Sequence, residues 1–276
     1  MAQRIIQHYT SCPINHMQEI LNVTAVQTEL FWESPAENRK KLAEVLSSTS
    51  TQTDVVVLPE MFTTGFTMNP QPYAEQPDGP TLAWMQQQAQ RLQAALTGSF
   101  IVSEENHYFN RLFWVFPDGR FETYDKRHLF RMAGEDGIYS AGKKQLMVTW
   151  KGWKIRPLIC YDLRFPVWSR NIEDAYDLLI YVANWPQARS SAWRTLLSAR
   201  AIENLSYVVG INRIGVDGLS VPYGGDSLIL DFKGHVLWDG RDIHTAVTYP
   251  LSIHELSTFR HKFPAYLDAD HFSIIS

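Results

Sequence analysis

The sequence predicts a single α/β domain in which helices cover both faces of β-sheet structure. Short apolar segments rich in β-branched residues, typical of buried strands, alternate with amphipathic segments of helical period. The connections between them are short, and no linker or internal repeat divides the 276 residues. A chain of this length with 45% apolar residues can bury a sizeable core.

In the first half of the chain, proline marks the start of each predicted helix. Pro35 and Pro80 occupy first helical positions, where the missing N–H costs nothing. The apolar face of the second helix is expected to extend to Leu96, with an apolar residue every three or four positions. Strands are predicted at 21–28, 54–60, 97–103, 112–116 and 121–125.

In the second half, a hairpin is expected across Lys151-Gly152, and an amphipathic helix carries Trp193, Leu197 and Ala201. Strands are predicted at 146–150, 153–159, 178–183, 207–211, 227–230 and 245–249. The domain is expected to cover 21–276. Residues 1–20 are interpreted as an irregular leader, with Met17 an alternative start, and 251–276 as a C-terminal tail on this domain or on a second subunit.

Composition favours a small-molecule partner. The formal net charge is −4 and no long basic run is present, which argues against nucleic acid or an anionic membrane surface. No apolar stretch of about 18 residues predicts a membrane span. Two cysteines, Cys12 and Cys160, suit a reducing compartment, and the N-terminus lacks the pattern of a secretory signal. We therefore expect a cytoplasmic protein.

Three chemically reactive residues share one architectural context. Glu60, Lys126 and Cys160 each lie at or just past the end of a predicted strand. Functional sites collect where strand ends of a sheet meet, so these side chains are expected to converge. Each also has a simpler interpretation: a buried hydrophobic cysteine, a carboxylate that caps a turn, or a solvated lysine.

Together the three side chains suit nucleophilic catalysis. A thiol with an ordinary pKa of about 8.5 is mostly protonated at neutral pH. A nearby ammonium would stabilise the thiolate of Cys160, and a carboxylate would accept its proton. Lys126 and the backbone N–H of Tyr161 are the expected donors to the oxyanion. Glu135, on a glycine-rich loop nine residues after Lys126, is expected to position substrate, amine or water.

These segments resemble the nitrilase superfamily of carbon–nitrogen hydrolases. Three signature segments occur in the family's order: Leu58-Pro59-Glu60, 125–130 and 160–166. Glu135 matches the family's second active-site glutamate. Further segments, at 60–66, 181–186, 199–204 and 224–227, resemble the omega-amidase branch. The resemblance implies a nitrilase-like α-β-β-α sandwich, a homodimer formed through its helical layers, and amidase chemistry without a metal or organic cofactor.

The branch implies short 2-oxo dicarboxylic acid monoamides as substrates, namely 2-oxoglutaramate and 2-oxosuccinamate. Hydrolysis through a thioester would give the 2-oxo acid and ammonia. Such an anion needs a cation for its carboxylate, and Arg189 is the expected clamp. Phe62, Phe66 and Trp185 are expected to wall the pocket, and Arg194 and Arg200 to be structural salt-bridge partners.

Other functions remain open at this point. Another amidase of the superfamily, acting on deaminated glutathione or a carbamoyl amine, would share the same catalytic residues, and a nitrilase is less well matched. A non-catalytic binding module would have no need of Glu60, Lys126 and Cys160 together. A Cys/His protease would need a histidine, for which His128 is the nearest candidate.

Overall fold

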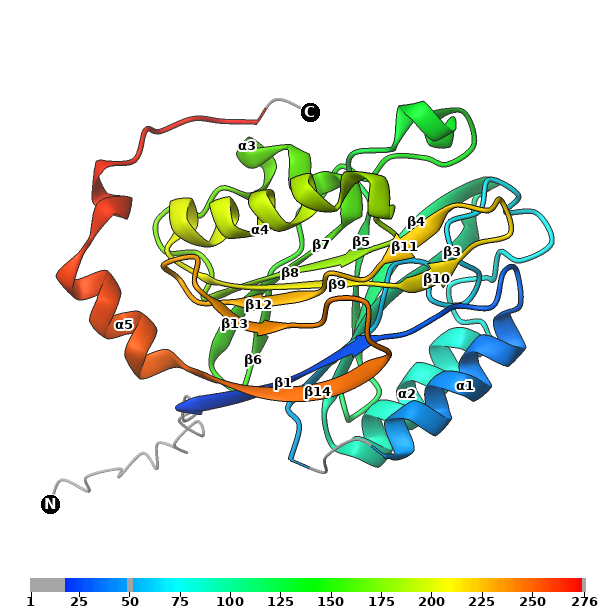
Figure 1. The fold of residues 1–276 in the computed structure, drawn as a ribbon, viewed down its shortest axis with the longest axis horizontal. Helices are drawn as coiled ribbons and strands as arrows, with labels where there is room; N and C mark the ends of the chain where they lie inside the picture. The colour runs from blue at the N-terminus through cyan, green and yellow to red at the C-terminus, as the bar shows by residue number, and fades with distance from the viewer. Residues whose placement is uncertain (1–17, 49–51, 275–276) are drawn as a thin grey trace, which may run out of the picture.

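Two six-stranded sheets lie face to face with helices outside each, in the computed structural model of residues 18–48 and 52–274 (Figure 1). The predicted α-β-β-α sandwich is therefore confirmed. Cys12 and the rest of the leader up to residue 17 lie outside the described residues. The first strand begins at Ile20, one residue before the expected start.

The first sheet has the strand order β14-β1-β2-β3-β4-β5. Its centre is parallel, β1 pairing with β2 and β2 with β3, and its edges are antiparallel. Parallel strands covered on both faces are continuously apolar, which explains the Val-Val-Val run of β2. The strands are β1 (Ile20–Gln27), β2 (Val55–Val57), β3 (Ala95–Glu104), β4 (His107–Val115), β5 (Phe121–Asp125) and β14 (Thr245–Ser252).

The second sheet has the order β13-β12-β9-β8-β7-β6, with β7, β8 and β9 parallel. The predicted hairpin joins β6 to β7 across Lys151 and Gly152, both with positive φ, as a tight hairpin turn requires. The strands are β6 (Val148–Trp150), β7 (Trp153–Ile159), β8 (Leu178–Ala183), β9 (Tyr207–Asn212), β12 (Leu228–Leu230) and β13 (Val236–Asp239). A small separate ribbon pairs β10 (Ile214–Val216) with β11 (Pro222–Gly224).

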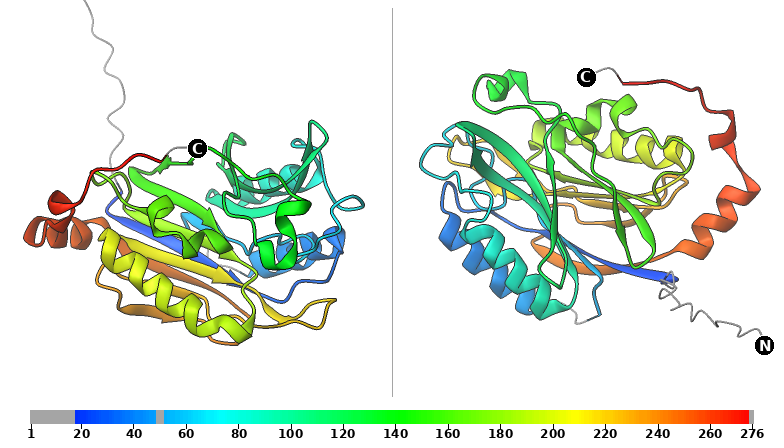
Figure 2. Two further views of the ribbon diagram at one scale, coloured as in Figure 1. Left: turned by 90° about the horizontal axis from the view of Figure 1, so that it is seen from above. Right: turned by 180° about the vertical axis from the view of Figure 1, so that it is seen from behind.

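Helices form the two outer layers (Figure 2). Helices α1 (Pro35–Ser47) and α2 (Pro80–Leu92) cover the first sheet, and α3 (Pro166–Ser169) and α4 (Ser190–Asn204) cover the second. Both proline starts are confirmed. The extension of the second helix to Leu96 is wrong, because Gln93 adopts a left-handed conformation that ends α2 and Leu96 belongs to β3.

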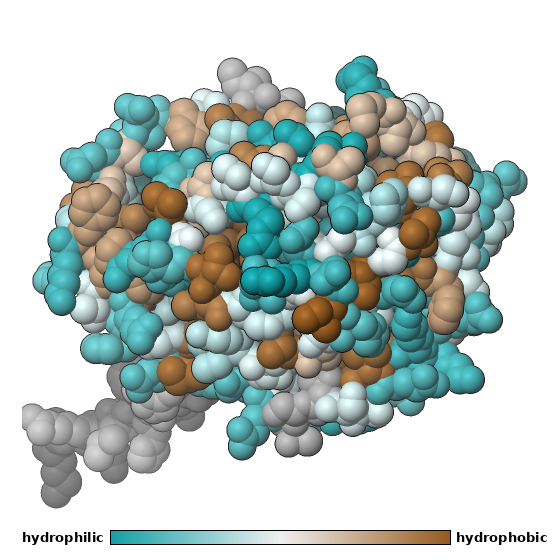
Figure 3. All heavy atoms as spheres, in the orientation of Figure 1, coloured by the Kyte–Doolittle hydropathy of each residue, from teal (hydrophilic) through white to brown (hydrophobic). Residues whose placement is uncertain are grey.

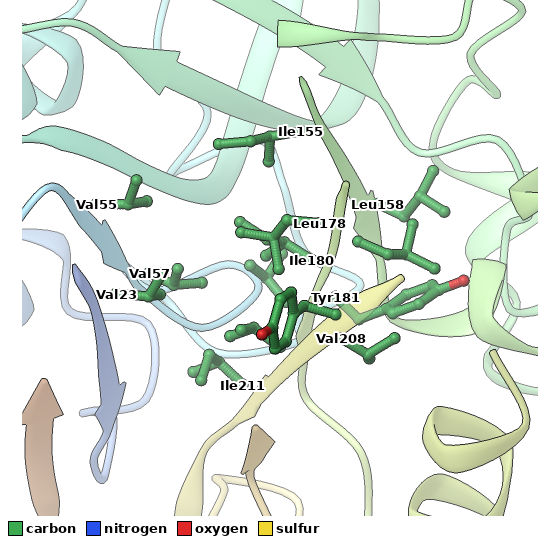
Figure 4. Packing of buried hydrophobic residues seen from close by; sticks show 14 of the residues in the cluster. Val23, Val55, Val57, Ile155, Leu158, Leu178, Ile180, Tyr181, Val208 and Ile211 are labelled. Atoms are coloured by element: carbon green, nitrogen blue, oxygen red, sulfur yellow. The ribbon is translucent and has the colours of Figure 1, made fainter. Parts of the chain in front are cut away.

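The main core lies between the sheets. Figure 4 shows side chains of the first sheet facing those of the second, Val23, Val55 and Val57 against Ile155, Leu178, Ile180 and Ile211. Each such apolar side chain contributes about 1.5–3 kcal/mol when fully buried. A second cluster packs the first sheet against its helices, with Leu42, Leu82, Met85 and Phe113 among its members.

The C-terminal segment is partly integrated into the domain. Residues 251 and 252 complete β14, which pairs with β1 along its full length. Helix α5 (Ile253–Lys262) is anchored by Arg260, whose guanidinium donates to the carbonyls of Leu205 and Tyr176 and to Asp177. The chain beyond α5 then runs outside the sandwich towards α3 (Figure 1, red).

The surface drawn in Figure 3 carries apolar side chains in small groups scattered among polar ones, an ordinary pattern for a globular domain. None of the helices in the described part of the chain has the length and apolar character needed to cross a membrane.

Candidate active site

Lys126 lies at the centre of a fully buried charge cluster. Its Nζ donates to Oε1 of Glu60 at 2.9 Å and to both carboxylate oxygens of Glu135 at 3.0 and 3.1 Å. All three side chains have 0% exposure. Lys126 follows β5 directly, and Glu135 begins the short 3-10 helix η2 (Glu135–Gly137). The structure thus brings together three of the four proposed catalytic residues by direct contact.

Cys160 lies at the end of β7, where the backbone turns sharply into the 3-10 helix η3 (Cys160–Arg164). Its φ is +44°, a conformation that non-glycine residues adopt only under constraint. The Sγ atom lies 3.9 Å from the carbonyl oxygen of Asn184, directly after β8. Cys160 and Lys126 line the same cavity, so the thiol faces the charge cluster.

Glu60 is held by donors from three other segments. Asn110 Nδ2 donates to its Oε1 and the backbone N–H of Asn184 to its Oε2, each at 2.8 Å, in addition to Lys126. Sequence reasoning missed both asparagines. Asn184 directly follows a buried strand, as Cys160 does, so the same signal could have found it. Asn110 lies inside β4, where no such signal exists.

Burial and charge shift the pKa values in this cluster. Burial alone would lower the pKa of Lys126, but the carboxylates of Glu135 and Glu60 outweigh it and raise that pKa, so the amine stays protonated. The pKa of Glu135 is raised, because burial and the charge of Glu60 together outweigh Lys126. Lys126 is therefore a permanent positive charge.

The thiol of Cys160 behaves differently from the expectation of a stabilised thiolate. Burial raises its pKa well above the usual value and the negative charge of Glu60 adds to this, while Lys126 only partly opposes them. Two carboxylates surround one ammonium, so a further anion is disfavoured. Cys160 therefore rests as a thiol, and its proton would have to be removed for the sulfur to act as a nucleophile.

The cavity beside Cys160 has a volume of about 390 Å³ and mostly apolar walls. Phe66 and Trp185 line it as expected, and Phe66 lies with its ring centroid 5.0 Å from Lys126 Nζ. Tyr161 lines it with its ring, which packs on Phe130. The role of the Tyr161 backbone N–H as an oxyanion donor stays a prediction.

The assignment of Phe62 to the pocket wall is wrong. Its ring is fully buried on the other side of the first sheet, with centroid distances of 5.8 Å to Trp84 and 6.1 Å to Phe100. Met61 has a φ of +41°, and this turn directs the next side chain into the core over Gly98. Phe62 therefore supports the strand end that carries Glu60.

Two arginines line the cavity. Arg189, at the end of the 3-10 helix η4 (Gln187–Arg189), lies with its guanidinium 5.1 Å from the centroid of Phe130. Arg164, in η3, lies 5.0 Å from the centroid of Trp185 and was not singled out from the sequence. Arg194 and Arg200 form the structural ion pairs expected of them, with Asp226, Asp239 and Glu203.

A further buried carboxylate joins the loops of Cys160 and Lys126. Asp162 accepts hydrogen bonds from the backbone N–H of Ile159 at 3.1 Å and from the hydroxyl of Tyr124 at 2.7 Å. On the other side it accepts from the backbone N–H and Nδ1 of His128, at 3.0 and 2.8 Å. His128 is thus engaged by Asp162 and does not line the cavity of Cys160, against the protease interpretation.

Comparison with known proteins gives the family. The model of the carbon–nitrogen hydrolase family matches residues 22–249. This chain belongs to the carbon–nitrogen hydrolase family. Within residues 18–48 and 52–274, no group of three or more His, Cys, Asp or Glu side chains is arranged to hold a metal ion.

Similar carbon–nitrogen hydrolases include curated amidases. The omega-amidase YafV of Yersinia enterocolitica is 46% identical and covers 92% of this chain and 99% of its own. The 2-oxoglutaramate amidase of Bacillus subtilis is 31% identical, over 89% of this chain and 96% of the amidase. A crystal structure from Xanthomonas campestris shows a CN-hydrolase superfamily protein with an arsenic adduct in the active site. It is 47% identical to this chain, with a TM-score of 0.91, over 93% of this chain and 100% of the other. The resemblance to amidases of the omega-amidase branch is confirmed.

Proposed function

We propose that this carbon–nitrogen hydrolase is an omega-amidase that hydrolyses the terminal amide of 2-oxoglutaramate and 2-oxosuccinamate. The products are the 2-oxo acid and ammonia. The observation that carries the proposal is the cluster of Glu60, Lys126 and Glu135 beside a thiol that lines a small, mostly apolar cavity. The identity to an omega-amidase and to a 2-oxoglutaramate amidase supports the choice of substrate.

The first step forms a bond between Cys160 Sγ and the amide carbon. Because the resting group is a thiol, its proton moves to Glu60 as the sulfur attacks. The carbonyl oxygen becomes an oxyanion, stabilised by Lys126 and by the backbone N–H of Tyr161. Each such donor is typically worth about 3–4 kcal/mol in the transition state.

The intermediate collapses when Glu60 returns the proton to the amide nitrogen. The C–N bond breaks, ammonia leaves, and a thioester remains on Cys160. Water then attacks the thioester with Glu60 again as the base, the C–S bond breaks, and the proton returns to sulfur. Glu135 fixes Lys126 from the opposite side and is placed to orient the leaving ammonia or the entering water.

Phe66 and Trp185 exclude water around the acyl chain, and Arg189 binds the substrate carboxylate. The proposed steps use side chains, one backbone N–H group and water. We further propose a cytoplasmic homodimer formed through the helical layer of α3 and α4. Exposed apolar side chains on this layer, Val167 at 56% and Ile202 at 53%, are suited to such a contact.

Ammonia release across a substrate panel tests the proposal. The panel contains 2-oxoglutaramate, 2-oxosuccinamate, deaminated glutathione, a carbamoyl amine and a simple nitrile. We expect the highest kcat/KM for one of the two 2-oxo acid amides. A higher value for deaminated glutathione or the carbamoyl amine would assign the enzyme to another branch of the family.

A further inference from the structure

The cavity has three basic residues in its wall, and one of them is already engaged. Lys126 is bound to Glu60 and Glu135, so its ammonium is not available to a distant carboxylate. The other two, Arg164 and Arg189, have no hydrogen bond or salt bridge from their guanidinium groups to any residue in 18–48 or 52–274. The cavity therefore contains two positive charges without a counter-ion.

Aromatic rings hold both guanidinium groups at the cavity wall. Arg164 lies 5.0 Å from the centroid of Trp185, and Arg189 lies 5.1 Å from that of Phe130. Both rings line the cavity. Contact with a ring fixes a guanidinium by its face and leaves the N–H groups on its edge free for a carboxylate.

Trp185 ties the two arginines to the nucleophile. Its Nε1 donates to the carbonyl of Arg189 at 2.8 Å, while its ring face contacts Arg164. It also follows Asn184, whose carbonyl lies 3.9 Å from Cys160 Sγ. Arg164 itself ends the short 3-10 helix η3, which Cys160 begins. The spacing between the thiol and the two charges is therefore set by a few short, well-packed segments.

The acidic residue of the cavity wall does not neutralise these charges. Asp217 accepts hydrogen bonds from the hydroxyl of Tyr223 at 3.0 Å and from the backbone N–H groups of Leu219 and Val221. Its carboxylate is thus engaged within its own loop. The surrounding walls are mainly apolar, which favours direct ion pairing of a bound anion over solvation.

We propose that Arg164 and Arg189 form a paired carboxylate site, with Arg164 as a specificity-determining residue equal in weight to Arg189. The site selects amides that carry a free carboxylate at the end opposite the reacting amide. A single arginine could bind such a group, but two on different segments fix both its position and the direction of the chain. This inference rests on the proposed function and adds how the enzyme distinguishes anionic from neutral amides.

The test compares two amides of equal length, glutaramate, which has a carboxylate, and pentanamide, which does not. In Arg164→Met and Arg189→Met, KM for glutaramate and 2-oxoglutaramate should rise at least about tenfold each, the scale of one lost charge-assisted contact. The kcat/KM for pentanamide should stay within about threefold of wild type. Arg164→Lys keeps the charge without the planar fork of the guanidinium, so its KM for glutaramate should lie between those of wild type and Arg164→Met.

Arg120→Met is the matched control. Arg120 is exposed, as Arg164 is, and also lies against a ring, 4.8 Å from the centroid of Phe116, but it is outside the cavity wall. It should leave both substrates unaffected. If Arg164→Met keeps the wild-type preference for glutaramate over pentanamide, the paired site is wrong. If wild type shows that preference yet does not hydrolyse 2-oxoglutaramate, the proposed function is wrong and the anion site stands.

Discussion

Lys126 Nζ and Glu60 Oε1 lie 2.9 Å apart with no exposure to solvent, although 66 residues separate them along the chain. The ends of β2 and β5 bring them together, and Glu135 closes the cluster from a third segment. The cluster contains two carboxylates and one ammonium. Burial and this imbalance together raise the pKa of the Cys160 thiol, and the following predictions rest on them.

Lys126→Met should abolish activity and also destabilise the protein. The variant removes the oxyanion charge and leaves two buried carboxylates without a positively charged partner. Breaking a buried ion pair typically costs about 3–5 kcal/mol, so thermal unfolding should shift markedly downward. Both kcat for 2-oxoglutaramate and the unfolding midpoint should be measured. An active variant of unchanged stability would contradict the central role of Lys126.

Glu60→Gln should make Cys160 more reactive towards alkylation while making the enzyme less active. Burial and the charge of Glu60 hold the pKa of the thiol high, and Lys126 acts in the opposite direction. Removing the negative charge lowers that pKa, so more thiolate exists at a given pH near neutrality. The rate of iodoacetamide labelling against pH measures this shift. At the same time kcat should fall at least about a hundredfold, because the base is lost.

In this experiment, slower labelling of Glu60→Gln than of wild type at every pH would show that Glu60 does not raise the thiol pKa. A kcat loss of less than tenfold would contradict its role in proton transfer.

Tyr124→Phe should slow catalysis without weakening substrate binding. Its hydroxyl donates to Asp162 and accepts from Trp168 Nε1, and Asp162 holds the turn that places Cys160. Losing one hydrogen bond to a buried charge costs about 1.5–3 kcal/mol, and part of this should appear as an approximately tenfold lower kcat with little change in KM.

Tyr207→Phe is the control for this effect. Its hydroxyl donates to the carbonyl of Ser252 at 3.1 Å, away from the cavity wall. It should lose some stability and keep its kcat. Equal kcat in the two variants would remove the link between Asp162 and the nucleophile.

Phe62→Leu and Phe66→Leu should have opposite effects. Phe62 is a core residue, so its truncation should cost about 1–2 kcal/mol of stability and leave KM almost unchanged. Phe66 lines the cavity over Lys126, so its truncation should raise KM with a small effect on stability. Urea unfolding and steady-state kinetics on both variants separate these roles. If KM rose in Phe62→Leu but not in Phe66→Leu, the assignment of Phe62 to the core and Phe66 to the cavity wall would be reversed.

The strands that could be predicted are those whose apolar runs are long and continuous. Residues 178–183 were predicted with the observed bounds, because a parallel strand buried on both faces is apolar at every position. Residues 153–159 were also predicted with the observed bounds, although they include Lys154 and Arg156, because the Lys151-Gly152 turn marks their start. The strands β10, β11 and β13 were not, because each has three or four residues and includes exposed ones. These short strands are stabilised by pairing with neighbouring strands in the folded protein, and a local sequence pattern does not reveal that pairing.

The active site shows the same difference between features that a local sequence pattern reveals and features that depend on contacts in the folded protein. Glu60, Lys126 and Cys160 could be selected because each lies at or just past the end of a predicted strand, a position visible in the sequence. The direction of Phe62 depends on one left-handed residue, Met61, and the contact of Arg164 with Trp185 depends on how two loops meet. The resting state of the thiol depends on how many carboxylates share one ammonium. These properties arise from distances in the folded chain.

The central claim is that the sulfur of Cys160 carries the acyl group during turnover. Rapid acid quenching of wild type with 2-oxoglutaramate, followed by intact-protein and peptide mass spectrometry, tests it directly. We predict one 2-oxoglutaryl group on the peptide that contains Cys160, formed within the first turnover and absent from Cys160→Ala. Continued ammonia release by Cys160→Ala, or an acyl group on another residue of the wild type, would contradict the account.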